Sequence, residues 1–159
     1  MKPELSLRSR ALQYLARREY SRAELAAKLR PYLAVESEDE FEQVQPVDID
    51  ELLDDLEASG YLSDERAVNQ LLHARRPRFG KQRIAHELHQ KGIAAELIEQ
   101  VMPQLLDSEL ETAHAVWHKK FGVPPHDAKE RARQMRFLQS RGFSLDVIFK
   151  VLKHPESDE

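Results

Sequence analysis

The chain has 159 residues, of which 41% are hydrophobic and 33% charged, so it can bury the core of one domain or of a few small stacked units. It has no cysteine, which excludes disulfides, thiolate metal sites and cysteine nucleophiles, and its formal net charge is -4. No apolar run approaches the roughly 20 residues that span a bilayer, and the N-terminus lacks a signal peptide, so we expect a soluble cytoplasmic protein.

Apolar residues recur at helical spacing throughout, and no useful run alternates like a strand. At the start of the chain, Leu7, Leu12 and Leu15 indicate one helix. Ser21 and Glu24 have the spacing of a capping box, which predicts the start of a second helix there. Residues 31–47 are acidic and bounded by prolines, so they form a predicted insertion before a helix that begins near residue 48 and ends at Gly60.

Later in the chain, helices are predicted from residue 63 to Pro77, from 81 to 90 and from about 95, where Pro103 can bend the helix. A long helix then ends near residue 121, a helix capped by Asp127 reaches about residue 141, and Ser144 begins the last one. These elements predict an all-α fold of about nine helices.

One sequence phrase occurs twice, at a spacing of fifty residues: HELHQKGIAAELIEQVM at 86–102 and RFLQSRGFSLDVIFKVL at 136–152. In both copies, a cation is followed by a glycine, as Lys91-Gly92 and Arg141-Gly142. Each pair lies between two predicted helices. Such self-similarity indicates tandem repeats, which stack because one three-helix unit buries little surface alone. We therefore expect three three-helix repeats in an elongated, curved rod, with Gly60, Gly92 and Gly142 as structural joints. The predicted limits are 1–62, 63–106 and 107–153, with a frayed tail at 154–159.

Basic and acidic residues are segregated along the chain. Residues 66–91 include seven basic residues and one acidic residue, whereas residues 92–111 include no basic residue and five acidic ones. A stacked array can then present cations on one face, although each block alone could be an ordinary solvated surface. Phe79, inside the first basic cluster, could stack on a base, but packing at a repeat junction is the preferred interpretation. The predicted contact residues are Arg75, Arg76, Arg78, Lys81, Arg83, Lys91, Lys119, Lys120, Arg131, Arg133 and Arg136.

Nothing in the sequence indicates catalysis or a resident cofactor. His86 and His89, like His114 and His118, have the spacing of ligands on one helix face, but neither pair has a third ligand in a zinc-type pattern. There is no phosphate-binding glycine loop and no nucleophile motif. We therefore expect a binding protein without metal, cofactor or enzymatic activity.

Several short segments of the sequence form a recognisable series. They are ALQYLARREYSRAEL at 11–25, GYLSDERA at 60–67, RRPRFG at 75–80, RIAHELHQKGI at 83–93, KFG at 120–122, RFL at 136–138 and RGF at 141–143. Together these segments resemble the RecX family of bacterial proteins, which regulate the recombinase RecA. The match covers most of the chain, and its specificity comes from the order and spacing of the segments. Two departures are the absence of a Lys-Gly turn after Leu29 and the presence of Ala67 where the family often has an aromatic residue.

The resemblance implies a monomeric, non-enzymatic protein that binds the RecA filament on single-stranded DNA. Family members restrain the ATPase, strand-exchange and co-protease activities of RecA. The basic residues would then contact RecA, DNA within that complex, or both. Two alternatives follow from the residues alone: a helical DNA-binding module that acts without RecA, and a repeat scaffold for another partner.

Overall fold

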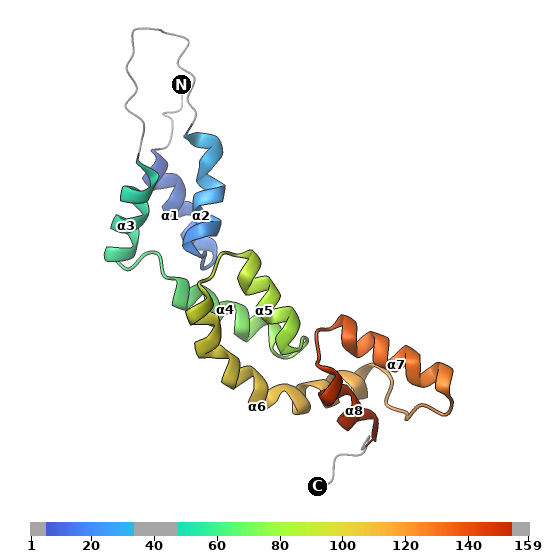
Figure 1. The fold of residues 1–159 in the computed structure, drawn as a ribbon. Coiled ribbons are helices and arrows are strands. Elements are labelled where there is room, and N and C mark those ends of the chain that lie inside the picture. Colours follow the sequence, from blue (N-terminus) through green and yellow to red (C-terminus); the bar gives the residue numbers. More distant parts are fainter. Residues whose placement is uncertain (1–5, 34–47, 154–159) are drawn as a thin grey trace, which may run out of the picture. The chain divides into compact units, whose positions relative to one another are not determined.

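The computed structural model describes residues 6–33 and 48–153, and every described segment is helix, turn or loop (Figure 1). The predicted insertion lies mostly outside the described residues, as does the predicted tail at 154–159. The all-α prediction is confirmed. The helices are α1 (Leu7–Arg17), α2 (Arg22–Leu29), the 3₁₀ turn η1 (Arg30–Tyr32), α3 (Ile49–Ala58), α4 (Asp64–Arg75), α5 (Lys81–Gln90), α6 (Ala95–Lys120), α7 (Ala128–Ser140) and α8 (Leu145–Lys153).

Local capping explains where several helices begin. The Ser21 hydroxyl accepts a hydrogen bond from the Glu24 backbone at 3.1 Å, while the Glu24 carboxylate accepts one from the Ser21 backbone at 3.1 Å. This is the predicted capping box. Asp48 caps α3 and Asp127 caps α7 through their side chains, and the cap at Asp127 is the predicted one.

The described part of the chain contains eight α-helices rather than the predicted nine. Two predicted helices, one on each side of residue 106, form the single helix α6, which continues through Pro103. Residues at intervals of four are buried along α6 from Val101 to Trp117, so one face packs inward on both sides of residue 106. This continuous face keeps the helix intact despite the backbone hydrogen bond that proline cannot donate. The buried residues are Val101, Leu105, Glu109, Ala113 and Trp117.

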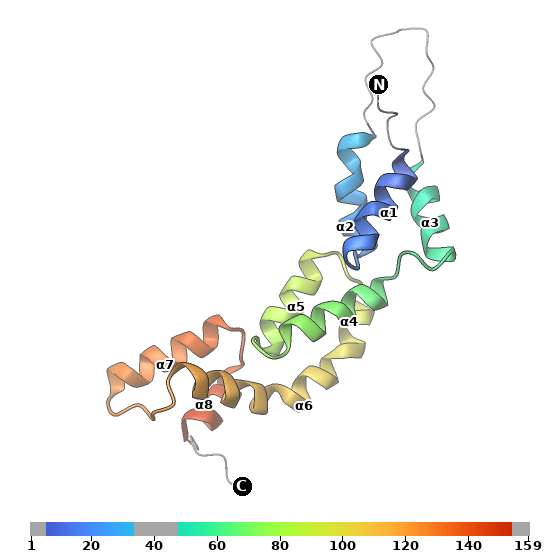
Figure 2. The ribbon, with the colours of Figure 1, turned by 180° about the vertical axis from the view of Figure 1, so that it is seen from behind.

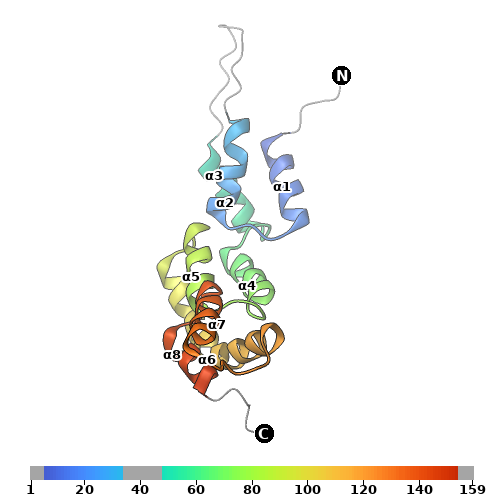
Figure 3. The same ribbon diagram turned by 90° about the vertical axis from the view of Figure 1, so that its right-hand side faces the viewer.

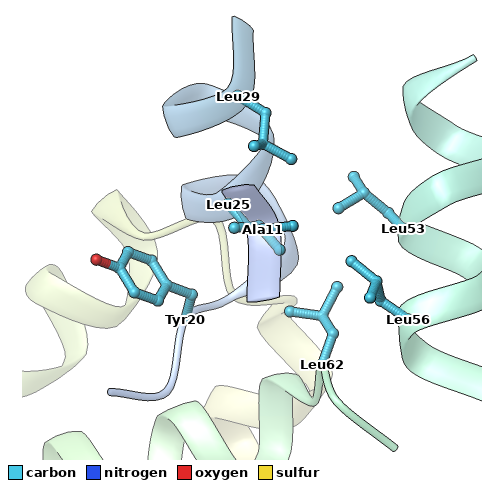
Figure 4. Close-up of a cluster of buried hydrophobic side chains, with 7 residues drawn as sticks. All are labelled: Ala11, Tyr20, Leu25, Leu29, Leu53, Leu56 and Leu62. Carbon is cyan, nitrogen blue, oxygen red and sulfur yellow. The ribbon is translucent and has the colours of Figure 1, made fainter. Parts of the chain in front are cut away.

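Backbone contacts divide the chain into two compact units. The first contains Met1–Val68 and Lys91–Ile93, so among described elements it holds α1 to α3 and the start of α4. These three helices lie side by side in Figure 3. Their core is mostly leucine, with α2 facing α3 (Figure 4). The buried residues are Ala11, Tyr20, Leu25, Leu29, Leu53, Leu56 and Leu62.

The second unit contains residues 69–90 and 94–159, and α6 is its central helix. Helices α5, α7 and α8 all pack against α6, and Figure 2 shows α7 and α8 beside its C-terminal half. The predicted limit at residue 106 therefore falls inside a helix that serves two repeats. The buried cluster around this half of α6 consists of Ala113, Trp117, Leu138, Phe143, Ile148, Val151 and Leu152.

The turn between α7 and α8 packs directly on the first turn of α5. The Gly80 backbone N–H donates to the Arg141 carbonyl at 2.8 Å, and the Gln82 N–H donates to the Gly142 carbonyl at 3.2 Å. Gly142 has φ +88°, and a Cβ added there would lie less than 3.0 Å from the backbone nitrogen of Arg83. Only glycine therefore permits this close approach.

In the first unit, the turn between α5 and α6 packs on the start of α2 in a similar way. The Ser21 hydroxyl donates to the Lys91 carbonyl at 2.6 Å. Gly92 has φ +74°, and a Cβ there would lie 2.5 Å from the Cβ of Ala23. Both copies of the duplicated sequence phrase thus form a turn that packs tightly on the start of a helix, through backbone donors at Gly80 and Gln82 in one case and the Ser21 hydroxyl in the other.

Candidate functional site

Arg75 and Arg76, in the first predicted basic cluster, are engaged by neighbouring helices. The Arg75 guanidinium donates to both oxygens of Glu87, at 3.0 and 3.1 Å, and this pairing raises the pKa of Arg75. Arg76 donates to the Ser108 hydroxyl at 2.9 Å and to the Gln104 carbonyl at 3.3 Å. Both side chains therefore link the end of α4 to α5 or α6, and they have fewer donors left for a partner.

Lys81 lies beside a buried carboxylate that the sequence analysis did not identify. Its Nζ is 3.9 Å from Oε2 of Glu109, whose side chain is only 2% exposed. The other oxygen of Glu109 accepts a hydrogen bond from the Ser144 backbone at 3.0 Å, at the start of α8. A buried carboxylate needs both a counter-charge and hydrogen bonds, so Lys81 has a structural role here.

Arg78 and Arg83 complete the first cluster, and both side chains are exposed. Among described residues, neither has a carboxylate within 4.0 Å. The Arg83 guanidinium lies over the Phe79 ring, 4.1 Å from its centroid, and donates to the Ser140 carbonyl at 3.1 Å. Arg83 is thus held in place while part of its planar group remains available.

Lys91 belongs to the first unit and is paired with an acid. Its Nζ lies 3.5 Å from the Glu24 carboxylate, which also accepts a hydrogen bond from Arg18 at 3.0 Å. Partial burial alone would raise the pKa of Glu24, but the bonds from Arg18 and the Ser21 backbone, with the charge of Lys91, lower it overall. Lys91 therefore shares the Glu24 carboxylate with Arg18, so it is a weaker candidate contact than the sequence indicated.

The second predicted cluster lies at the end of α6 and along α7, and all its members are exposed. Arg133 lies 3.3 Å from Glu130 in the same helix. Such an exposed pair contributes only about 0–1 kcal/mol and opens easily. Within the described ranges, no carboxylate lies within 4.0 Å of the four remaining members, which are Lys119, Lys120, Arg131 and Arg136.

Arg141 is a candidate that the sequence analysis treated only as part of a repeat joint. Its guanidinium lies 5.3 Å from the Phe79 ring centroid and 5.1 Å from the Phe137 ring centroid. Lys120 lies 5.4 Å from the same Phe137 ring. We call Arg83, Phe79, Arg141, Phe137 and Lys120 the cation–ring row. The only sequence signal for Arg141 was its position beside Gly142 in the repeated phrase.

Phe79, for which two roles were considered, packs against the guanidinium groups of Arg83 and Arg141 at the junction of α5 with the α7–α8 turn. The histidines show no comparable grouping: His114 makes an edge contact with Trp117 at 6.0 Å, and His86, His89 and His118 are exposed. Among the described residues, no group of three or more His, Cys, Asp or Glu side chains could hold a metal ion. No described helix is long and apolar enough to cross a membrane.

Comparisons with known proteins match almost the whole chain to RecX proteins. Family models for the second and third three-helix domains of RecX match residues 63–102 and 107–152. Regulatory protein RecX of Leptothrix cholodnii is 48% identical over 152 residues, which cover 96% of this chain and 90% of that protein. Regulatory protein RecX of Herbaspirillum seropedicae is 49% identical over 99% of this chain and 96% of that protein.

The fold is also similar to a solved structure. The crystal structure of RecX from Lactobacillus salivarius has a TM-score of 0.73 and 20% sequence identity, and the match covers 93% of both chains. The architecture described above is therefore shared over nearly its full length with that protein.

Proposed function

Because this chain belongs to the RecX family of regulatory proteins, we propose that it binds the RecA filament on single-stranded DNA and restrains the activities of RecA. The restrained activities are ATP hydrolysis, strand exchange and co-protease activity. The protein acts as a cytoplasmic monomer, without a cofactor and without catalysis of its own. Its partner is the filament, and DNA is contacted within that complex.

The observation that carries this proposal is the set of exposed cations along α5, α6 and α7. In the first unit, some basic side chains meet acids: Arg22 lies 2.7 Å from Asp54 and 3.0 Å from Glu57, and Arg66 lies 3.0 Å from Glu19. In the second unit, several exposed cations have no described carboxylate within 4.0 Å. A protein of net charge -4 can therefore present a local positive field to phosphates or to an acidic protein face.

A titration of RecA ATPase on single-stranded DNA tests the proposal. We expect ATP turnover to fall as this protein is added at or below the molar amount of RecA. No change at any ratio would contradict the proposal.

The contact surface is tested with charge reversals at positions that have no described acidic partner, namely Arg78→Glu, Arg131→Glu and Arg136→Glu together. We expect this variant to keep its helical content and to lose at least about tenfold in inhibitory potency, because repulsion replaces attraction at each site. The matched control reverses three exposed cations of the first unit: Arg8→Glu, Arg17→Glu and Lys28→Glu. Equal losses in both variants would argue against a specific basic surface.

The unpaired cations also motivate the second candidate function, a DNA-binding module that acts without RecA. It predicts that naked single-stranded DNA is bound as tightly as RecA-coated DNA, with strong salt dependence. The proposed function predicts clear preference for the coated DNA. Binding measured on both substrates at one salt concentration separates the two.

A further inference from the structure

The cation–ring row holds like charges together without a described acid. Arg83 and Arg141 lie over one ring, at 4.1 and 5.3 Å from its centroid, so their charges are within about 10 Å of each other. Arg141 and Lys120 share the Phe137 ring in the same way, at 5.1 and 5.4 Å. No carboxylate of the described residues lies within 4.0 Å of these three cations.

Local structure accounts for part of this arrangement only. The C-terminus of α7 attracts positive charge, and the Ser140 carbonyl accepts a bond from Arg83. The aromatic faces attract each cation separately. Neither effect removes the mutual repulsion of three cations, which a bound anion would relieve.

We propose that the cation–ring row binds the phosphodiester backbone of single-stranded nucleic acid, without reading its sequence. The proposal deepens the proposed function and depends on it only for the source of the DNA, which is the filament. It adds Arg141 to the binding residues and assigns DNA, rather than RecA, to this part of the surface.

The geometry favours phosphate over stacked bases. Cations already lie over the rings of Phe79 and Phe137, so these aromatic groups order the guanidinium planes and are not free platforms for bases. A guanidinium beside an aromatic ring keeps its N–H donors, and two of them on one edge match two phosphate oxygens. A row of such groups suits a chain of evenly repeated anions.

The geometry also favours a nucleic acid over a protein face. Protein interfaces bury a central apolar patch, and the exposed large apolar side chains of the second unit belong to other positions. They are Leu106, Leu110, Val123, Leu145 and Phe149. The residues of the cation–ring row offer only charge and ring edges, which is the composition of a phosphate-binding surface.

The test measures binding of a labelled oligothymidylate by fluorescence anisotropy, from low salt upward, for the full chain without RecA. For wild type, the logarithm of affinity should fall with the logarithm of salt concentration. In Arg83→Gln/Arg141→Gln we expect the slope to become shallower by about two, roughly one for each lost phosphate contact. The control Arg8→Gln/Arg17→Gln removes the same charge from exposed positions on α1, and its slope should stay within experimental error of wild type.

Equal slope changes in both variants would overturn the proposal, because the effect would then be one of net charge. Absence of wild-type binding even at the lowest salt would also overturn it. If Arg83→Gln/Arg141→Gln keeps the wild-type slope but binds RecA-coated DNA less tightly, the row contacts protein, and the assignment to phosphate is wrong. Circular dichroism and urea unfolding of each variant exclude misfolding as the cause.

The same measurements distinguish this inference from the proposed function. Normal salt-dependent DNA binding with no effect on RecA ATPase would contradict the function and leave the phosphate site intact. If wild type and Arg83→Gln/Arg141→Gln both inhibit RecA and their salt slopes for DNA binding are equal, the proposed function is supported and the phosphate site is contradicted.

Discussion

Gly60, Gly92 and Gly142 all have φ between 74° and 88°, yet their surroundings differ. A Cβ at Gly60 would meet no atom within 4 Å. A Cβ at Gly142 would lie within 3.0 Å of the Arg83 backbone, which cannot move without disturbing α5. The same backbone conformation therefore serves as a helix end at one position and as a tight contact between segments at the other.

This difference predicts unequal effects of alanine substitution. Gly60→Ala should lower the free energy of unfolding by about 1–2 kcal/mol, the usual cost of the left-handed conformation for an L-residue. Gly142→Ala should lose at least about 1 kcal/mol more, because it also overpacks the contact with α5. Urea unfolding followed by circular dichroism measures both values, and equal losses would mean that the contact at Gly142 is easily relaxed.

Glu24 predicts a specific pH dependence of stability. The pKa of the Glu24 carboxyl is lowered in the folded protein. Its stabilising contribution is therefore fully present above the unfolded pKa of about 4.3, and it is lost as pH falls below that value and through the lower folded pKa. Glu24→Gln can still accept the capping hydrogen bond from Ser21, but it loses the charge that attracts Arg18 and Lys91.

We therefore expect wild type to lose more unfolding free energy than Glu24→Gln between pH 6 and about pH 3. Urea titrations at several pH values give this difference. Glu111→Gln, at an exposed position, is the control and should follow wild type. Parallel pH profiles for wild type and Glu24→Gln would show that the Glu24 cluster does not contribute.

At the level of helices, α6 and α7 are joined by a buried polar pair. The Trp117 indole N–H donates to the Gln134 side chain at 2.8 Å, and the Gln134 amide donates to the Val123 carbonyl at 3.1 Å. Gln134 lies fifty positions after Ile84, which is an apolar core residue of α5. The third repeat thus has a glutamine where the second has an aliphatic side chain, and it can do so because the only tryptophan of the chain is its partner.

This pair predicts non-additive stability changes. Gln134→Leu should lower the unfolding free energy by about 1–3 kcal/mol, because it leaves the buried indole N–H without an acceptor. In Trp117→Phe/Gln134→Leu both polar groups are absent, so the double variant should lose less than the sum of the single variants. Urea unfolding of the four proteins gives the coupling, with Gln139→Leu as an exposed control, and additive losses would contradict the prediction.

Across the whole molecule, charge is organised differently in the two units. Acidic residues of α3 neutralise Arg22 in the first unit. In the second unit, the buried carboxylate of Glu109 accepts a hydrogen bond at the start of α8 and lies beside Lys81. Many other cations of that unit have no described carboxylate within 4.0 Å, and we predict that the contacts with the filament lie among them.

Helical spacing was sufficient to predict the all-α class, and the spacing of Ser21 and Glu24 was sufficient to predict the capping box. Both depend on short-range periodicity and local hydrogen bonding, which a sequence displays directly. The family was predicted from the resemblance of several segments, in their order and spacing, to RecX proteins. The helix count differed by one because proline usually interrupts a helix, while the buried face of α6 outweighed that local preference. The contact roles of the basic residues stay predictions.

Only the tertiary structure separated the cations that stabilise the fold from those that are available to a partner. Arg75 and Arg78 look alike in the sequence, but Glu87, twelve residues away from Arg75, pairs with that residue alone. Arg141 looked like part of a turn until Phe79 and Phe137 were brought to it from other segments. Charge type and periodicity can be read along the chain, but pairing depends on distances between segments that are brought together only when the chain folds.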